Sequence, residues 1–217
     1  SITCGYGVDD PDKEHHFKTA TEDVTKAYAY KTALALNADY SMVSVSGYGI
    51  ISGFTNDGNK IPEQTIPQYY DKLGFSYNKF ADSITVSETE WDFERYKPDI
   101  IVINLGTNDM NYATTDERKA EFEDGYLDFL KKVRSLNPDS YIFQTYGVMG
   151  TSLEENIENV RRKYMSETGD ERITFIPLTM QDEDADGIVA DWHPSPRTHS
   201  LVSQKVTAAI KKTLGYK

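Results

Sequence analysis

Short apolar runs alternate along the chain with segments in which apolar residues recur at helical spacing. The run from Asp99 to Gly106 is apolar at successive positions, which is typical of a strand covered on both faces of a sheet. Further strands are predicted at Tyr40 to Gly47, at 140–147 and at 173–177. A helical pattern follows most of these strands, so the sequence predicts βα units and a mainly parallel sheet.

The helical segments are marked by apolar residues three and four positions apart and by capping residues. They are predicted at Thr19 to Asn37, Pro67 to Leu73, Thr114 to Leu136, Ser152 to Glu167 and Pro196 to Leu214. Thr19 with Glu22 and Thr114 with Glu117 have the spacing of capping boxes, and Ser195 is expected to cap the last helix. The predicted fold class is α/β, a three-layer α/β/α sandwich with a mainly parallel sheet, formed by one domain over residues 1–217.

Composition and charge narrow the classes of partner. Hydrophobic residues make up 38% of 217 residues, enough for a sizeable core. Lys and Arg number 23 against 35 Asp and Glu, and the formal charge of -12 disfavours nucleic acid and anionic membrane surfaces as partners. Apolar runs are much shorter than the roughly 20 residues that span a bilayer. Cys4 is the only cysteine, which excludes an internal disulfide and a cysteine-based zinc site.

The best candidate for a general base is His193 in "ADWHPSP". In an extended segment, residues i and i+2 project to the same side, so the Asp191 carboxylate is expected to reach one imidazole nitrogen and fix its tautomer. Trp192 would then point the other way, into the core or toward a substrate. The alternative is a loop histidine whose acidic neighbour only caps the following helix.

Three other motifs lie at predicted strand ends, where ligands bind in parallel sheets. "GTND" places the Asn108 amide after the most apolar strand, where it can donate to an oxyanion, and Gly47 in "SVSGYG" offers a backbone N–H. Ser1 in "SITCGYG" is a candidate nucleophile. Each alone is equally a turn or a terminus, but the order Ser, Gly, Gly-Thr-Asn-Asp, Asp-x-His supplies a nucleophile, oxyanion donors and a base together.

With these motifs the sequence resembles the SGNH hydrolase superfamily, of flavodoxin-like fold, over nearly the whole chain. More narrowly, "SITCGYGV", "SGYGI", "WDFERYKPDIIVINLGTND" and "DWHPS" look like the catalytic domain of carbohydrate esterase family 2, the acetyl xylan esterase type. That resemblance implies that Ser1 is the nucleophile, that Ser1, Gly47 and Asn108 form the oxyanion hole, and that Asp191 orients the base His193. It also implies a Gly-Asp pair and a β-sandwich domain upstream, so we expect a chain truncated just before the nucleophile.

The implied function is a serine esterase that removes O-acetyl groups from plant cell-wall polysaccharide, such as acetylated xylan or glucomannan. It needs no metal and no organic cofactor, and the resemblance implies a secreted protein. Aromatic side chains near the motifs are expected to bind the sugar. They are Trp192, Tyr48, Tyr112 and Trp91. Core packing is the alternative for each of them.

Three other interpretations stay open at this point. The α-amine of Ser1 is the base in N-terminal nucleophile hydrolases, although those enzymes have antiparallel sheets. A lipase or thioesterase on the same fold, and a polysaccharide-binding module with vestigial catalytic residues, are the others. The remaining histidines are given structural roles: His15 and His16 are expected to be a solvated loop pair, and His199 to face solvent or form a salt bridge.

Overall fold

The computed structural model describes residues 1–75, 79–80 and 84–216. The chain divides into two compact units. Unit 1 comprises Ser1–Ser46, Tyr146–Thr151 and Ile176–Lys217, and unit 2 comprises Gly47–Thr145 and Ser152–Phe175. Each unit therefore contains segments from distant parts of the sequence.

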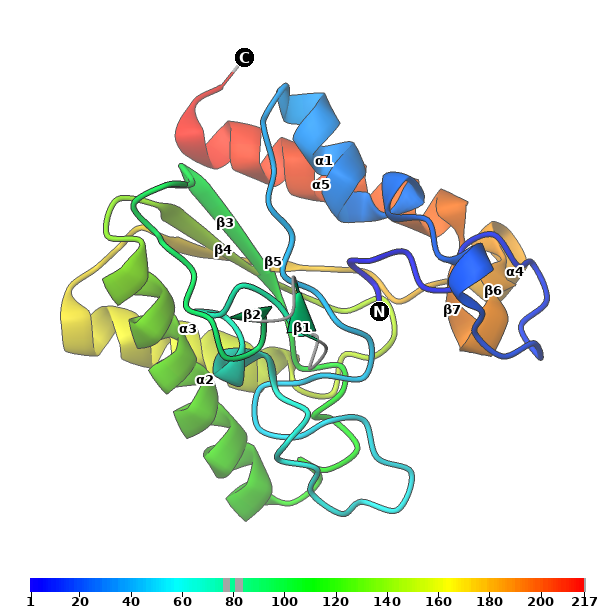
Figure 1. Ribbon diagram of the computed structural model, residues 1–217, viewed down its shortest axis with the longest axis horizontal. Coiled ribbons are helices and arrows are strands. Elements are labelled where there is room, and N and C mark those ends of the chain that lie inside the picture. Colours follow the sequence, from blue (N-terminus) through cyan, green and yellow to red (C-terminus); the bar gives the residue numbers. More distant parts are fainter. Residues whose placement is uncertain (76–78, 81–83, 217) are drawn as a thin grey trace. The chain divides into compact units, whose positions relative to one another are not determined.

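The central sheet has the strand order β3–β4–β5 (Figure 1). β3 (Ile100–Asn104) pairs in parallel with β4 (Tyr141–Tyr146), and β5 (Ile173–Pro177) is the other neighbour of β4. All three strands lie where the apolar runs predict them. The predicted α/β class with a mainly parallel sheet is confirmed.

In unit 2, two long helices accompany these strands. α2 (Asp116–Leu136) packs against α3 (Glu154–Thr168), and the two lie side by side in Figure 1. The Thr115 side chain accepts a hydrogen bond from the Arg118 backbone N–H, so the α2 cap lies one residue after the predicted Thr114. The buried core side chains are Phe122, Tyr126, Phe129, Leu130, Val133, Ile142, Phe143, Ile157, Val160 and Tyr164.

The remaining elements of unit 2 are short. They are η3 (Ile66–Gln68), β1 (Lys79–Phe80) and β2 (Ile84–Thr85), of which β1 and β2 pair antiparallel. The helix predicted at Pro67 to Leu73 is thus only a single 3-10 turn around η3. The polar stretch from Gly53 to Pro62 contains no helix or strand.

Unit 1 is organised around α5 (Pro196–Leu214), which lies along α1 (Tyr28–Leu36) in Figure 1. The Ser195 hydroxyl accepts from the Thr198 backbone N–H at 3.2 Å, as the predicted cap requires. The other elements are η1 (Thr19–Thr21), η2 (Val24–Lys26), α4 (Glu183–Asp186), η4 (Ala190–Trp192) and the antiparallel pair β6 (Ile188–Val189) and β7 (His193–Pro194).

Two further predictions of secondary structure are wrong. The single helix expected from Thr19 to Asn37 is broken into η1, η2 and α1, since the Asp23 side chain caps a new turn by accepting from the Thr25 backbone N–H. The segment from Tyr40 to Gly47 has no assigned strand. Its Tyr40 and Val43 side chains are exposed, so it lacks the burial that a central strand such as β4 has.

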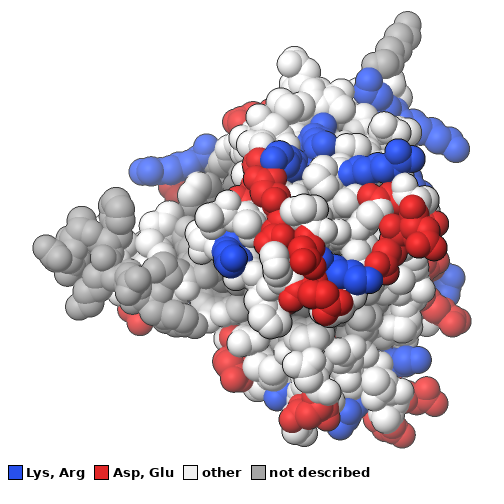
Figure 2. All heavy atoms as spheres, turned by 90° about the vertical axis from the view of Figure 1, so that its right-hand side faces the viewer, with Lys and Arg blue, Asp and Glu red and all other residues white. Residues whose placement is uncertain are grey.

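Charge on the described surface is mixed. On the face drawn in Figure 2, both Lys and Arg and Asp and Glu side chains are present. Among the described residues, no helix combines the length and the apolar character needed to cross a membrane.

Candidate functional site

The candidate base His193 begins β7, directly after the tight turn η4. Asp191 and Trp192 both adopt left-handed backbone conformations, with φ of 50° and 58°. The segment is therefore not extended, and the prediction that the Asp191 carboxylate reaches the imidazole is wrong. Instead, Nδ1 of His193 lies 3.0 Å from the main-chain oxygen of Asp191 and 3.3 Å from that of Ala190.

These two contacts fix the tautomer of His193. A carbonyl oxygen only accepts hydrogen bonds, so Nδ1 carries the proton and Nε2 keeps its lone pair. Burial of the ring disfavours its charged form and lowers the pKa of His193 to about 4. At neutral pH the imidazole is neutral, with Nε2 available to accept a proton.

The Asp191 carboxylate points to the N-terminal segment. Its Oδ2 accepts from the Tyr6 hydroxyl at 2.7 Å and from the Phe17 backbone N–H at 2.8 Å, and its Oδ1 lies 2.9 Å from His16 Nδ1. Burial raises the pKa of Asp191, but these donors outweigh it and the net shift is downward. The carboxylate is thus ionised and fully engaged, and sequence separations of more than 170 residues hide these partners from sequence analysis.

Ser1 lies in a turn that packs against the residues preceding His193. The backbone N–H of Tyr6 donates to the Ser1 carbonyl oxygen at 3.3 Å. A Cβ on Gly7 would lie 2.9 Å from the Ala190 side chain, so glycine is required for this close approach. Farther along, the Ala190 N–H donates to Asp10 at 3.0 Å. The N-terminal segment and the His193 hairpin form one structural region of unit 1.

The oxyanion candidates Gly47 and Asn108 belong to unit 2. The Asn108 Nδ2 donates to the Tyr48 carbonyl oxygen at 2.8 Å, which ties the two motifs together and orients the amide. An amide nitrogen carries two hydrogens, so one remains for a ligand. Gly47 has φ of +81°, a conformation that side chains rarely adopt, and this explains glycine at that position.

Asp109, which is not among the predicted site residues, holds this region in place. Its buried carboxylate accepts from the backbone N–H groups of Ile50, Ile51 and Ser52 at 2.8–3.1 Å. A Cβ on Gly49 would lie 2.4 Å from the same carboxylate. The signal in the sequence is an acidic residue directly after Asn108, together with the glycine-rich stretch from Gly47 to Gly53.

Of the four predicted sugar-binding aromatics, Trp192 is exposed and Tyr48 is half-buried. Trp192 is 46% exposed, and its carbonyl oxygen accepts from Gln181. Tyr48 is half-buried and packs edge-on against Tyr69 and Phe75, so its ring belongs to a local aromatic cluster beside Asn108.

Tyr112 packs inside unit 2 instead of presenting its ring. It is buried, with the Arg118 guanidinium 4.6 Å from its centroid and its hydroxyl donating to Glu121 at 2.7 Å. The Lys60 ammonium lies 5.7 Å from the same centroid. Both the face and the hydroxyl are engaged within the unit, so the structure gives Tyr112 a packing role in place of the predicted substrate contact.

Trp91 lies near the other end of the strands from Asn108. Its backbone N–H donates to the Asp71 carbonyl oxygen at 2.9 Å, and the Asp71 carboxylate pairs with Lys132 near the end of α2. α2 ends just before β4 begins, so Trp91 lies beside the amino ends of the strands. Asn108 follows the carboxyl end of β3, which argues against a shared sugar site with Trp91.

The other histidines differ in part from prediction. His15 and His16 are exposed and pair with acidic groups, with His15 Nδ1 3.0 Å from Asp10. His199 is buried, contrary to the expected solvent or salt-bridge position, and its Nδ1 accepts from the Tyr28 backbone N–H at 3.2 Å. In the part of the chain that the structure describes, no three His, Cys, Asp or Glu side chains are gathered as metal ligands.

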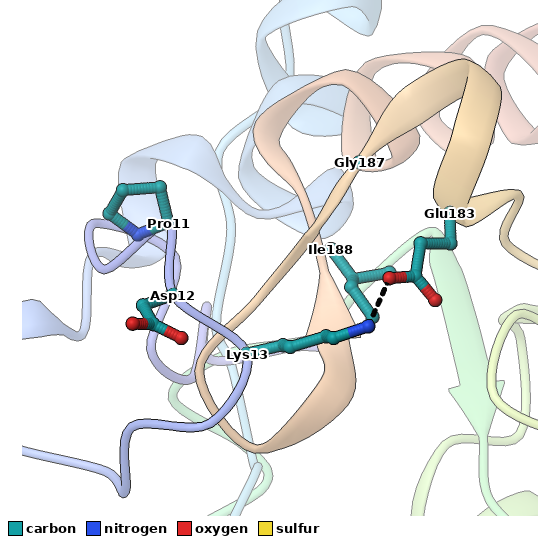
Figure 3. A pocket seen from close by; sticks show the side chains of 6 residues that line it. All are labelled: Pro11, Asp12, Lys13, Glu183, Gly187 and Ile188. Atoms are coloured by element: carbon teal, nitrogen blue, oxygen red, sulfur yellow. Dashed lines mark hydrogen bonds and ion pairs between the residues drawn. The ribbon is translucent and has the colours of Figure 1, made fainter.

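An open hollow of about 480 Å³ lies beside the β6–β7 hairpin (Figure 3). Its lining residues are Pro11, Asp12, Lys13, Glu183, Gly187 and Ile188. The Lys13 ammonium reaches across it to pair with Glu183. None of the predicted catalytic residues lines this hollow, so we assign it no chemistry.

Comparison with known families agrees with the motifs. Residues 1–201 match the GDSL-like Lipase/Acylhydrolase family. The chain belongs to this family. The matched part of the chain includes Ser1, Gly47, Asn108 and His193.

Its relatives include carbohydrate esterases. The chain is 33% identical over 225 residues to the cellulase/esterase CelE of Acetivibrio thermocellus, covering 100% of this chain and 25% of CelE. A family two carbohydrate esterase from Clostridium thermocellum, solved in complex with cellohexaose, is 32% identical with a TM-score of 0.83, covering 100% of this chain and 63% of that one.

A third similar protein is Est2A, an acetyl xylan esterase from the rumen bacterium Butyrivibrio proteoclasticus. It is 25% identical with a TM-score of 0.91, over 100% of this chain and 63% of Est2A. The resemblance to carbohydrate esterase family 2 is thus confirmed. The chain spans a quarter of the length of CelE and less than two thirds of the two solved relatives.

Proposed function

We propose that the protein is a serine esterase that removes O-acetyl groups from plant cell-wall polysaccharide through an acetyl-enzyme intermediate. The observation that carries this proposal is the state of His193. Its ring is buried and neutral, and its Nδ1 is held by two main-chain carbonyl groups, so Nε2 is available as a base. Membership of an acylhydrolase family supports the reaction class.

In the proposed reaction, Nε2 of His193 accepts the hydroxyl proton of Ser1 as the Ser1 oxygen attacks the acetyl carbonyl. The resulting oxyanion is stabilised by the Asn108 amide and by the backbone N–H groups of Gly47 and Ser1. The imidazolium returns its proton to the departing sugar oxygen, which leaves Ser1 acetylated. Water, deprotonated by His193, then releases acetate and restores the Ser1 hydroxyl.

Asp191 takes a different part in this scheme from the predicted one. Its main-chain carbonyl oxygen, not its carboxylate, accepts from Nδ1 of His193 and stabilises the imidazolium as it forms. The carboxylate binds Tyr6 and Phe17 of the N-terminal segment that also contains Ser1. We propose that Asp191 orients the base through its backbone and anchors the nucleophile's segment through its side chain.

The proposed substrate is acetylated xylan or glucomannan. The acetyl xylan esterase activity in the name of Est2A and the cellohexaose bound by the Clostridium thermocellum relative support a polysaccharide. The exposed indole of Trp192, one residue before the base, offers a face on which a sugar ring can stack. Such polymers lie outside cells, so we propose that the protein is secreted.

The test is acetate release by the full-length protein from 4-nitrophenyl acetate, acetylated xylan and acetylated glucomannan. Ser1→Ala is expected to lower kcat by more than about 1,000-fold, because the attacking oxygen is lost. Ser135→Ala, an exposed serine on α2, is the matched control and should retain activity.

Three results would contradict the proposal. Full activity of Ser1→Ala would remove Ser1 as the nucleophile. Preference for long-chain over acetyl esters would indicate a lipase on the same fold. An inert protein that still binds the polymer would indicate a binding module with vestigial catalytic residues.

A further inference from the structure

The aromatic ring of Tyr6 lies between two other rings. Its centroid is 4.0 Å from that of His193, with 28° between the planes, and 4.4 Å from that of Phe17, with 25° between the planes. All three residues belong to unit 1. The imidazole of the candidate base is therefore packed face to face against a tyrosine that the mechanism does not use.

The edge of the Tyr6 ring is fixed as well. Its hydroxyl donates to Asp191 Oδ2 at 2.7 Å, and the same oxygen accepts from the backbone N–H of Phe17. Asp191 is two residues before His193 and offers that base its main-chain carbonyl oxygen. One residue thus holds the imidazole by its backbone and the ring stacked on the imidazole by its side chain.

The two kinds of contact restrain different motions of His193. Hydrogen bonds from Nδ1 to the Ala190 and Asp191 carbonyl groups fix the direction in which the Nδ1–H bond points. They leave the ring free to tilt about that direction. Face-to-face packing against Tyr6 opposes tilting, so the position of Nε2 is fixed only when both are present.

We propose that Tyr6 is a positioning residue for His193, which holds the plane of the imidazole by stacking while Asp191 holds the Tyr6 hydroxyl. This inference rests on the proposed esterase function. It also gives the Asp191 carboxylate a second role. Besides anchoring the N-terminal segment, the carboxylate acts on the base indirectly, through the tyrosine ring.

Two substitutions separate the contribution of the Tyr6 ring from that of its hydroxyl, and a third substitution is the control. Tyr6→Phe keeps the stack and removes the bond to Asp191, whereas Tyr6→Leu removes the stack. Tyr164→Phe is a matched control, because Tyr164 on α3 also donates its hydroxyl to a carboxylate, that of Asp170 at 2.8 Å, and is stacked on no predicted catalytic residue. All are measured on the full-length protein with 4-nitrophenyl acetate and acetylated xylan.

We expect kcat to fall about 10-fold in Tyr6→Phe and about 100-fold in Tyr6→Leu, with KM within about 2-fold, since misplacement of a base affects the chemical step. Tyr164→Phe should match the unaltered protein. In Tyr6→Phe, the acidic limb of the pH profile of kcat/KM should move toward neutral pH, because the pKa of His193 rises. With one donor lost, the Asp191 charge is less neutralised and stabilises the imidazolium more strongly.

The outcomes distinguish this inference from the function on which it rests. Retained activity in Ser1→Ala overturns the esterase proposal itself. If Ser1→Ala is inactive while Tyr6→Leu keeps the kcat of the unaltered protein, only the role of Tyr6 is overturned. Should Tyr6→Leu fail to fold, Tyr6→Phe decides: an unchanged acidic limb and unchanged kcat would leave Tyr6 a packing residue.

Discussion

Asp109 is the buried charge on which the loop around Gly49 depends. Three consecutive backbone N–H groups, of Ile50, Ile51 and Ser52, donate to its carboxylate. Burial raises the pKa of Asp109 to about 6, with these donors acting in the opposite direction, so the group is ionised at neutral pH. An ionised carboxylate accepts from all three donors at once, which a neutral amide cannot do.

Asp109→Asn is therefore expected to destabilise the protein. The amide nitrogen would face N–H groups, and the free energy of unfolding should fall by about 3 kcal/mol. Urea unfolding at pH 7 measures this loss. Asp57→Asn, an exposed loop carboxylate with backbone and side-chain donors of its own, is the control and should change stability far less. Equal unfolding midpoints for the two variants would contradict the role given to Asp109.

Trp192 is the residue at which substrate binding and catalysis can be separated. Its indole is exposed and adjoins His193, so Trp192→Ala should raise KM for acetylated polysaccharide about 10-fold through loss of sugar stacking. The kcat for 4-nitrophenyl acetate, which has no sugar, should stay within about 2-fold. Tyr216→Ala is the control, since Tyr216 is equally exposed but follows the far end of α5, about 28 Å along the helix. An unchanged KM for the polymer would exclude Trp192 as a sugar platform.

At the scale of elements, local signals were sufficient where they agreed with tertiary packing. The apolar runs of β3, β4 and β5 are sufficient to predict these strands, although β4 is buried over most of its length and only Ile103 is buried in β3. α5 is predicted because Ser195, Pro196 and Gly215 mark its ends. For His199, helical spacing indicates burial. Counting along α5, it lies on the same face as Val202, Val206 and Ile210, which are all buried.

Other elements depend on partners far away in the sequence. The predicted helix from Thr19 breaks where the Asp23 N–H donates to Gly5 and where Thr21 accepts from Asp9, because these long-range bonds compete with helical ones. The turn before His193 has two left-handed residues that no periodic pattern indicates. The candidate base was therefore found by its motif, whereas its hydrogen-bond partners and Tyr6 required the structure. An upstream β-sandwich stays a prediction.

For the whole molecule, buried titratable groups set how stability depends on pH. Burial lowers the pKa of both His193 and His199 to about 4, from 6.5 in an exposed imidazole. Between these values the unfolded chain binds more protons than the folded one. The folded state is therefore most stable, as far as these two groups decide it, above pH 6.5. Its free energy of unfolding falls as the pH drops toward 4, by up to about 1.4 kcal/mol per pH unit for each imidazole.

Asp109 contributes in the opposite sense. Its folded pKa of about 6 lies above 3.8, so the folded state holds an extra proton between these values and gains stability as the pH falls. One carboxyl thus offsets one imidazole below pH 6. Together these three groups give a loss of about 1.4 kcal/mol per pH unit between pH 6 and 5, above the range in which the carboxyls of lowered pKa begin to titrate. Urea unfolding at high salt measures this loss, with surface repulsion from the net charge of -12 screened.

His199→Asn identifies the groups responsible. An asparagine oxygen can accept the Tyr28 N–H in place of Nδ1, while the titrating imidazole is gone. Between pH 6 and 5 the remaining histidine and Asp109 then cancel, and the free energy of unfolding should become nearly independent of pH in that window. A variant that loses stability as steeply as the unaltered protein would show that acid acts through other groups. A flat profile would assign the loss of stability between pH 6 and 5 to the buried imidazoles of His193 and His199.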